Sequence, residues 1–106
     1  MKAAGTRPIS EKEFQAQVVQ YARLCGWAAY HTHDSRHSAK GFPDLVLARA
    51  GRPGGGGRVV MAELKVGRNE PTEEQQAWLD VLGAVPGVEV YLWRPTNFDD
   101  IQEVLR

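Results

Sequence analysis

The sequence predicts an α/β domain in which helices and strands alternate along the chain. Apolar residues recur at helical spacing in three segments, four short runs have the composition of strands, and capping residues or glycines separate them. The predicted order is therefore αβββαβ followed by a short C-terminal helix. The 106 residues suffice for a single domain, which we expect to span residues 10–106 after a flexible lead over residues 1–9.

The first helix is predicted to begin after Ser10, whose hydroxyl can cap it, and to end at Gly26. Its buried face is an apolar stripe with helical spacing: Phe14, Val18, Tyr21, Ala22 and Cys25. Residues 27–31 alternate weakly, which favours a first strand. The polar residues 33–40 then favour a loop.

The next two strands are predicted to pair as a hairpin. Residues 45–48 are continuously apolar, which is typical of a central strand. In residues 59–66 alternate side chains share a face. One set is apolar and forms the core face: Val60, Ala62, Leu64 and Val66. The other set carries the charged groups: Val59, Met61, Glu63 and Lys65. The connection contains four glycines, 54–57, and is longer than a tight turn.

The second helix is predicted to begin after Thr72 and to end within residues 83–87. Alternation over residues 88–93 predicts the fourth strand, and the apolar spacing over residues 98–105 predicts a short final helix. Trp78 and Trp93 fall inside periodic apolar elements. We therefore expect them in the core rather than as platforms for stacking bases.

Composition excludes several classes of function. The 13 Lys and Arg balance 13 Asp and Glu, so any contact with nucleic acid must come from a local cluster. Cys25 is the only cysteine, which excludes an intramolecular disulfide, and no apolar run is long enough for a membrane span. The first residues lack the apolar core of a signal peptide, and the glycine run lacks the ending of a phosphate-binding loop. We expect a cytoplasmic protein with no membrane partner and no small organic cofactor.

Two carboxylates and a lysine are expected to meet at one edge of the sheet. Asp44 directly precedes the second strand, and Glu63 and Lys65 end the third, so hairpin pairing brings them together. Hard oxygen ligands of this kind bind Mg²⁺, which usually takes one or two protein carboxylates and keeps several waters. Such a site suits phosphodiester hydrolysis, in which a water molecule attacks the phosphate. Lys65 would position or help deprotonate that water, and its charge would stabilise the transition state. The alternative is a surface ion pair worth roughly 0–1 kcal/mol, but the preceding Pro-Asp pair favours the metal site.

Two further polar residues have alternative interpretations. Glu13 stands three residues after Ser10 and fits a capping box, yet it also borders the apolar stripe, where it could face a metal. Gln75 has the same spacing from Thr72, but it also continues the inward stripe of the second helix. An inward amide needs a partner, since an unpaired one costs roughly 1–3 kcal/mol. The partner of the Gln75 amide could be a carboxylate, Lys65 or a phosphate oxygen.

The histidines at positions 31, 33 and 37 do not match the spacing of a closed structural zinc site. One interpretation combines them with Arg36, Lys40 and Arg68 in a basic, hydrogen-bonding rim beside Asp44, which could hold phosphates without reading sequence. The alternative is a solvated polar loop. The DNA contacts that we expect come from His33, Ser35, Arg36, Lys40 and Arg68.

Taken together, these residues resemble the PD-(D/E)XK nucleases, and specifically the small stand-alone, virus-type VRR-NUC domains. The similarity runs from about Ser10 to the Trp93-Arg94-Pro95 end of the chain. The matching motifs are Glu13, His31-Thr32-His33-Asp34-Ser35-Arg36, Gly41-Phe42-Pro43-Asp44, Glu63-Leu64-Lys65 and Gln75. They are specific in combination and weak singly.

The resemblance implies a restriction-endonuclease-like core with a mixed central sheet flanked by helices. It implies five catalytic residues: Glu13, Asp44, Glu63, Lys65 and Gln75. It also implies a Mg²⁺ or Mn²⁺ site formed by Asp44, Glu63, Glu13 and the backbone carbonyl of Leu64. The implied substrate is branched DNA, such as a Holliday junction or a flap, cut by a homodimer because two symmetric cuts need two sites. The virus-type members imply the cytoplasm of an infected bacterial host as the setting.

We therefore expect a metal-dependent DNA endonuclease that selects DNA structure rather than sequence. A restriction-like enzyme that reads a defined sequence is an alternative of the same class. A non-catalytic nucleic-acid-binding or assembly subunit that retains the nuclease fold is an alternative of a different class. The intact carboxylates and lysine argue against it, because such a subunit would be free to lose them.

Overall fold

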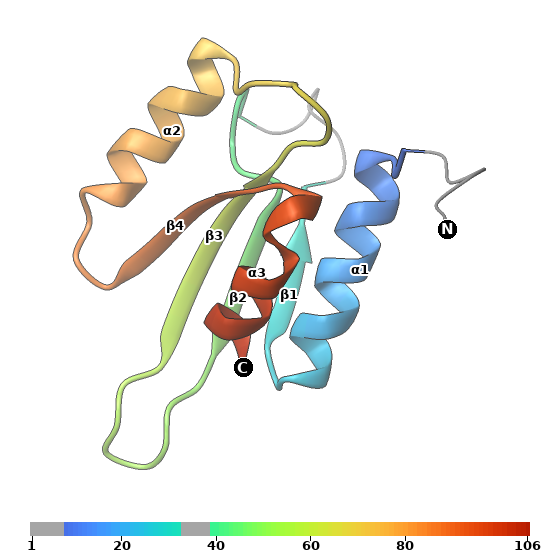
Figure 1. The fold of residues 1–106 in the computed structure, drawn as a ribbon. Coiled ribbons are helices and arrows are strands. Elements are labelled where there is room, and N and C mark those ends of the chain that lie inside the picture. Colours follow the sequence, from blue (N-terminus) through green and yellow to red (C-terminus); the bar gives the residue numbers. More distant parts are fainter. Residues whose placement is uncertain (1–7, 33–38) are drawn as a thin grey trace, which may run out of the picture.

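The structure is a computed structural model and describes residues 8–32 and 39–106. These residues form three α-helices and four strands in the predicted order (Figure 1). The elements are α1 (Glu11–Leu24), β1 (Ala28–His31), β2 (Leu45–Arg49), β3 (Arg58–Leu64), α2 (Glu73–Gly83), β4 (Val88–Trp93), the 3₁₀ turn η1 (Pro95–Asn97) and α3 (Phe98–Leu105). None of the helices in these ranges is both long and apolar enough to cross a bilayer.

The four strands form one mixed sheet in the order β1-β2-β3-β4. Strand β2 is antiparallel to β1 and β3, whereas β3 and β4 are parallel and joined through α2. The predicted hairpin is confirmed, because Leu45 pairs with Ala62 and Arg49 with Arg58. Continuing this register by one residue places Asp44 beside Glu63.

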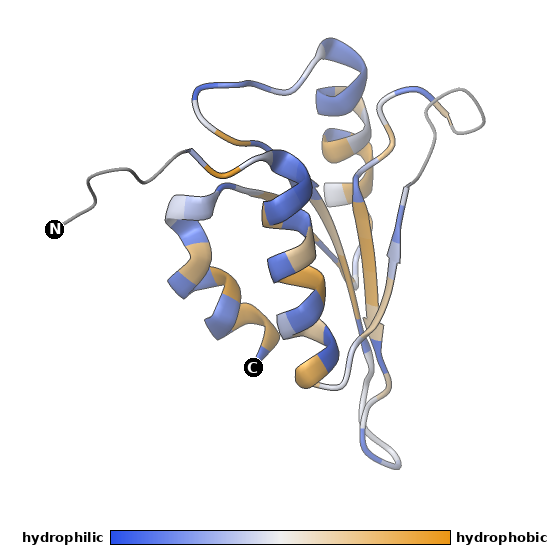
Figure 2. Cartoon of the chain, turned by 90° about the vertical axis from the view of Figure 1, so that its right-hand side faces the viewer, coloured by the Kyte–Doolittle hydropathy of each residue, from blue (hydrophilic) through white to orange (hydrophobic). Residues whose placement is uncertain are grey.

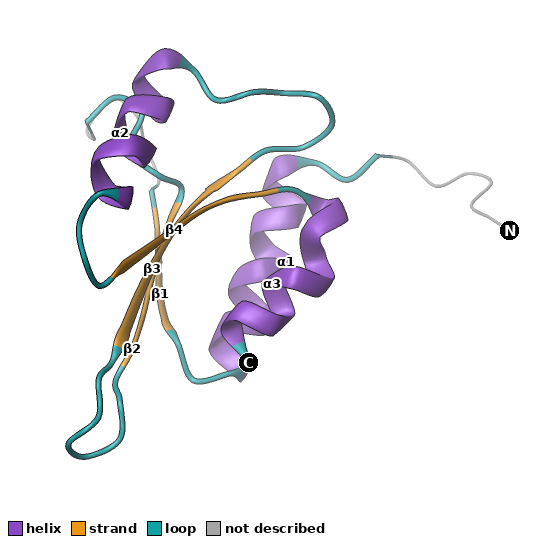
Figure 3. Ribbon diagram, turned by 60° about the vertical axis from the view of Figure 1, so that its left-hand side comes forward, coloured by secondary structure: helices purple, strands orange, loops and turns teal. Residues whose placement is uncertain are grey.

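Helices cover both faces of the sheet. Helices α1 and α3 lie on one face and α2 on the other (Figure 3). The first face contains the main core, and Figure 2 shows apolar residues concentrated on the strands and on the helix turns that face them. Fully buried there are Phe14, Val18, Ala22, Leu45, Leu47, Val60, Ala62, Leu64, Ile101 and Leu105. The predicted core face of the third strand is therefore confirmed, and each large side chain in it stabilises the fold by roughly 1.5–3 kcal/mol.

Both predicted helix starts are confirmed. Ser10 Oγ accepts a hydrogen bond from the N–H of Glu13 at 3.1 Å, and Thr72 Oγ1 accepts one from the N–H of Gln75 at 3.2 Å. Gly26, just beyond α1, has φ +89°, a conformation that favours glycine. Capping residues thus fix where both helices begin, and a glycine fixes where the first one ends.

The two tryptophans expected in the core differ. Trp93 is 3% exposed, as predicted. Trp78 is only half-buried, because α2 lies over the loop before β2 and the indole packs against Phe42, with ring centroids 5.1 Å apart. Leu79 is the buried side chain of α2 instead. The helical stripe was correctly predicted, but its tryptophan faces a loop and solvent.

Candidate metal centre and nuclease site

Several elements bring their ends to one edge of the molecule. The first turn of α1, the end of β1, the start of β2, the end of β3 and the start of α2 lie opposite the glycine-rich turn (Figure 1). Residues that are far apart in the sequence therefore meet at this edge.

Asp44 is held by the backbone around it. Its Oδ2 accepts a hydrogen bond from the N–H of Leu64 at 2.8 Å, which ties the start of β2 to the end of β3. Thr32 donates its N–H to the carbonyl of Asp44 at 2.9 Å and its hydroxyl to the carbonyl of Pro43 at 3.0 Å. These bonds fix the position of the Asp44 carboxyl group at the start of β2.

Glu63 is a buried carboxyl group. It is 1% exposed, and neither side-chain oxygen has a hydrogen-bond partner among the described residues. Burial raises the pKa of Glu63 to about 8, the nearby charge of Asp44 adds to this increase, and Lys65 opposes it. Buried polar groups are normally paired, because an unpaired one destabilises the fold. Glu63 therefore requires a functional explanation.

Lys65 lies beside Glu63 with 12% of its side chain exposed. Its Nζ is 3.6 Å from Glu63 Oε2, which is close enough for charge attraction but too long for a hydrogen bond. The N–H of Lys65 donates to the carbonyl of Trp93 at 3.0 Å and so extends the β3–β4 pairing by one residue. Because this ion pair is largely buried, it is not the exposed surface pair that was the alternative interpretation.

The structure places Glu13 in the helix cap and a second glutamate of the same helical turn near Asp44 and Lys65. Glu13 Oε1 accepts a hydrogen bond from the N–H of Ser10 at 2.9 Å, as the capping-box interpretation predicts. Glu11 is half-buried, and its pKa is raised by burial and then by the charge of Asp44, whereas Lys65 lowers it. These interactions place Glu11 within electrostatic range of both Asp44 and Lys65.

The sequence did contain a signal for Glu11. This residue precedes Phe14 by three positions and Val18 by seven, so it continues the buried stripe of α1 by one turn toward the site. Glu13 lies off that stripe. Extending the apolar periodicity by one turn toward the N-terminus would have singled out Glu11.

Gln75 also belongs to a capping box, because its Oε1 accepts a hydrogen bond from the N–H of Thr72 at 2.8 Å. The loop that carries Asp44 packs closely on this helix start. A Cβ on Gly41 would lie 2.5 Å from the carbonyl carbon of Glu74 and 2.7 Å from the nitrogen of Gln75. Gln75 is therefore adjacent to the loop of Asp44, with its side-chain oxygen engaged in the cap.

The predicted DNA-contacting residues are only partly described. His33, Ser35 and Arg36 lie outside the described residues. Lys40 is exposed and its Nζ lies 3.5 Å from Glu74 Oε2, while Arg68 is exposed in the loop that follows Lys65.

A residue that the sequence did not single out holds this loop. Arg94 donates from Nη1 to the carbonyl of Gly67 at 3.1 Å and lies 3.2 Å from the carboxylate of Glu70. The loop therefore stays close to the end of β4. Arg94 is a positioning residue for the segment between Lys65 and α2.

The oxygen ligands fit Mg²⁺ or Mn²⁺ better than a closed structural metal site. Within residues 8–32 and 39–106 there is no group of three or more His, Cys, Asp or Glu residues suited to holding a metal. Magnesium requires only one or two protein carboxylates and takes its other ligands from water and phosphate. The oxygens of Glu63 and Asp44 are hard ligands of this kind.

Comparison with solved structures finds the same fold in another protein. A chain named "VRR_NUC domain protein" matches with a TM-score of 0.68, covering 93% of this chain and 87% of that chain at 17% identity. This chain has the VRR-NUC fold. The resemblance drawn from the sequence is thus confirmed at the level of the fold, as is the α/β class with its mixed sheet. By sequence, no protein family and no curated protein matches the chain.

Proposed function

We propose that this chain is a divalent-metal-dependent DNA endonuclease that hydrolyses phosphodiester bonds in branched DNA. One observation carries the proposal: Glu63 is buried beside Asp44 and Lys65, and its carboxyl oxygens have no hydrogen-bond partner among the described residues. In a nuclease fold, a cation ligand explains why such a destabilising group is kept. The VRR-NUC fold supports the same activity.

The proposed roles follow from the positions of the side chains. Asp44, Glu63 and the carbonyl of Leu64 would hold Mg²⁺ or Mn²⁺. Such an ion lowers the pKa of a bound water and offsets the negative charge of the phosphate. Lys65 would orient the attacking water, accept its proton or stabilise the developing charge. Glu11 takes the place of Glu13 as the proposed third carboxylate.

Substrate binding is proposed to depend on local contacts, since the chain has no net charge. Lys40 and Arg68 would contact phosphates, which fixes the position of DNA without reading its sequence. Gln75 would contact the substrate or the lysine through its side-chain nitrogen. A homodimer would supply two sites for paired cuts. A cytoplasmic setting suits a chain with a single cysteine.

Cleavage of a panel of labelled Holliday junctions, flaps, single strands and linear duplexes tests this proposal. We expect the protein to cut branched DNA with Mg²⁺ or Mn²⁺ and to be inactive with a chelator. Lys65→Ala should keep the fold and lower the cleavage rate by about 10²–10⁴-fold, because the proton acceptor or its charge is lost. Arg23→Ala is the control, since Arg23 is exposed at the far end of α1.

Cleavage by Lys65→Ala at the rate of the unsubstituted protein would contradict the mechanism. Metal binding without cleavage of any DNA in the panel would favour the non-catalytic binding or assembly subunit. Cutting of a long linear duplex at one defined sequence would favour the restriction-like enzyme. The panel therefore distinguishes the three functions.

A further inference from the structure

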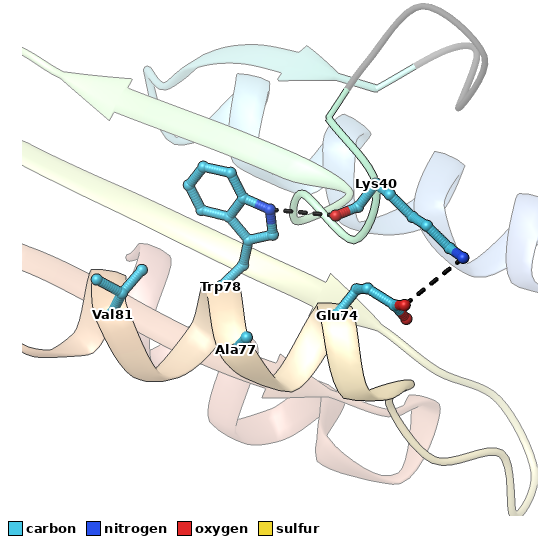
Figure 4. A pocket seen from close by; sticks show the side chains of 5 residues that line it. All are labelled: Lys40, Glu74, Ala77, Trp78 and Val81. Carbon is cyan, nitrogen blue, oxygen red and sulfur yellow. Dashed lines mark hydrogen bonds and ion pairs between the residues drawn. The ribbon is translucent and has the colours of Figure 1, made fainter.

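An open hollow of about 410 Å³ lies on α2, beside the loop that carries Asp44. Ala77, Trp78 and Val81 form its apolar lining, with Lys40 and Glu74 at its rim (Figure 4). Ala77 contributes only a methyl group on the side of the helix next to the indole. The hollow therefore presents an aromatic ring bordered by one cation and one anion.

The indole of Trp78 is fixed from two sides. Its Nε1 donates to the carbonyl of Lys40 at 3.2 Å, and its ring meets Phe42 edge-on with 80° between the ring planes. A preorganised ring loses little conformational entropy when a ligand stacks on it. Trp27 and Trp93 are each only 3% exposed. Trp78 is therefore the indole that a planar ligand can reach.

The charges of Lys40 and Glu74 are placed to suit the phosphate and the base of a nucleotide, respectively. The Lys40 side chain is 81% exposed, and an exposed ion pair like the one with Glu74 is worth roughly 0–1 kcal/mol, so Lys40 can turn to a phosphate. The carboxylate of Glu74 repels a phosphate from the hollow itself but can accept a hydrogen bond from the amino group of a base. A neutral base would thus lie on Trp78, with its phosphate outside at Lys40.

The hollow is close to the proposed cleavage site. Lys40 precedes Asp44 by four residues, a stretch that spans at most about 14 Å. This distance corresponds to at most about four nucleotides at the 3.4 Å spacing of a strand in duplex DNA. A base inside a duplex is covered by its stacked neighbours, so only an unpaired base can lie on the indole.

We propose that Trp78 stacks on an unpaired base of the DNA substrate, within about four nucleotides of the bond that is cut. The inference rests on the proposed endonuclease function and deepens it, because it selects DNA with a single-stranded segment, such as a flap, over continuous duplex. Stacking on an aromatic ring tolerates any base. It therefore provides selection by structure without selection by sequence.

Binding titrations in chelator test this inference separately from cleavage. Oligothymidylate should quench the tryptophan fluorescence of the unsubstituted protein. Trp78→Leu should lose the quenching and bind flap DNA about 5- to 150-fold more weakly, which is the range expected for one stacked base. Trp78→Phe, which keeps a ring, should recover most of the affinity. Val85→Ala is the matched control, because Val85 is exposed beyond the end of α2 and outside the hollow.

The inference would be overturned if Trp78→Leu weakened the binding of flap DNA and of blunt duplex DNA by the same factor. It would also be overturned if Trp78→Leu bound flap DNA as tightly as the unsubstituted protein does. Loss of a dimer in sedimentation with unchanged flap binding would assign the hollow to self-association and also overturn it. Quenching by oligothymidylate without cleavage of any DNA would support stacking and would contradict the endonuclease function.

Photo-crosslinking of the unsubstituted protein to a bromouracil oligonucleotide does not depend on the folding of a variant. A crosslink at Trp78 supports the inference, and crosslinks confined to other residues contradict it.

Discussion

At the scale of single residues, Glu63 has an environment that a purely structural role does not explain. Its carboxyl group is buried beside a second carboxylate and 3.6 Å from Lys65, without a hydrogen bond from any described residue. A buried carboxyl group without a hydrogen bond destabilises a fold. We infer that the position is kept for its affinity for a cation.

The metal-free protein should lose stability as the pH rises. The pKa of Glu63 in the folded state, about 8, exceeds its ordinary value of 4.5, so between these values the folded state binds more protons than the unfolded state. The stabilisation is fully present below the ordinary pKa and is lost as the pH rises through the folded-state pKa. In chelator, Glu63→Gln should therefore melt about 4 °C or more above the unsubstituted protein at about pH 9, and the gap should shrink toward about pH 5.

Thermal melts over that pH range check the prediction. Glu73→Gln serves as the control, because Glu73 is exposed in the first turn of α2. A melting temperature that has the same pH dependence in the unsubstituted protein and in Glu63→Gln would contradict the buried, unpaired state of this carboxyl group.

Two neighbouring glutamates provide a matched pair of variants. Glu11→Ala should lower cleavage strongly with little effect on folding, because the side chain lies near Asp44 and Lys65. Glu13→Ala should instead destabilise the fold by about 0.5–1 kcal/mol through loss of the capping box and leave the cleavage rate nearly unchanged. Urea denaturation and cleavage rates measured on both variants check this. The reverse pattern would return the catalytic role to Glu13.

At the scale of elements, the local sequence pattern predicted the buried faces of the strands better than it predicted what surrounds α2. A strand has a side-chain period of two, so the core face of β3 and the position of Glu63 followed from alternation alone. The exposure of Trp78 did not, because it depends on the loop over residues 40–44 packing on the start of α2. That packing requires Gly41, whose role appears only when both segments are placed in space.

Gly41→Ala should therefore disturb both folding and the site. Its φ is +87°, and an added Cβ would meet the backbone of Glu74 and Gln75. Gly87 is a matched control, since its φ is +86° but nothing lies within 4 Å of an added Cβ. Gly87→Ala should cost only the backbone term of roughly 1–2 kcal/mol, whereas Gly41→Ala should cost clearly more and also lower cleavage. Equal costs in urea denaturation would show that the loop and α2 are not tightly packed.

At the scale of the whole molecule, the order of elements and the meeting of Asp44, Glu63 and Lys65 were predictable, because hairpin pairing and strand alternation determine them. The proximity of Glu11 to Asp44 and Lys65 was not predicted, since the sequence analysis considered only Glu13 in the first turn of α1. Substrate choice is a further step removed from the sequence. Because the protein has no net charge, its choice of substrate would depend on which exposed side chains surround the edge of the sheet.

Titration of the whole protein with Mn²⁺ most directly tests the claim that Asp44 and Glu63 share a divalent ion. Calorimetry at a pH above the pKa of Glu63 should show binding that weakens by about tenfold or more in both Asp44→Asn and Glu63→Gln, since even indirect supports of a metal ligand contribute that much. Glu73→Gln should bind Mn²⁺ like the unsubstituted protein. Equal Mn²⁺ affinity in all four proteins would contradict the account.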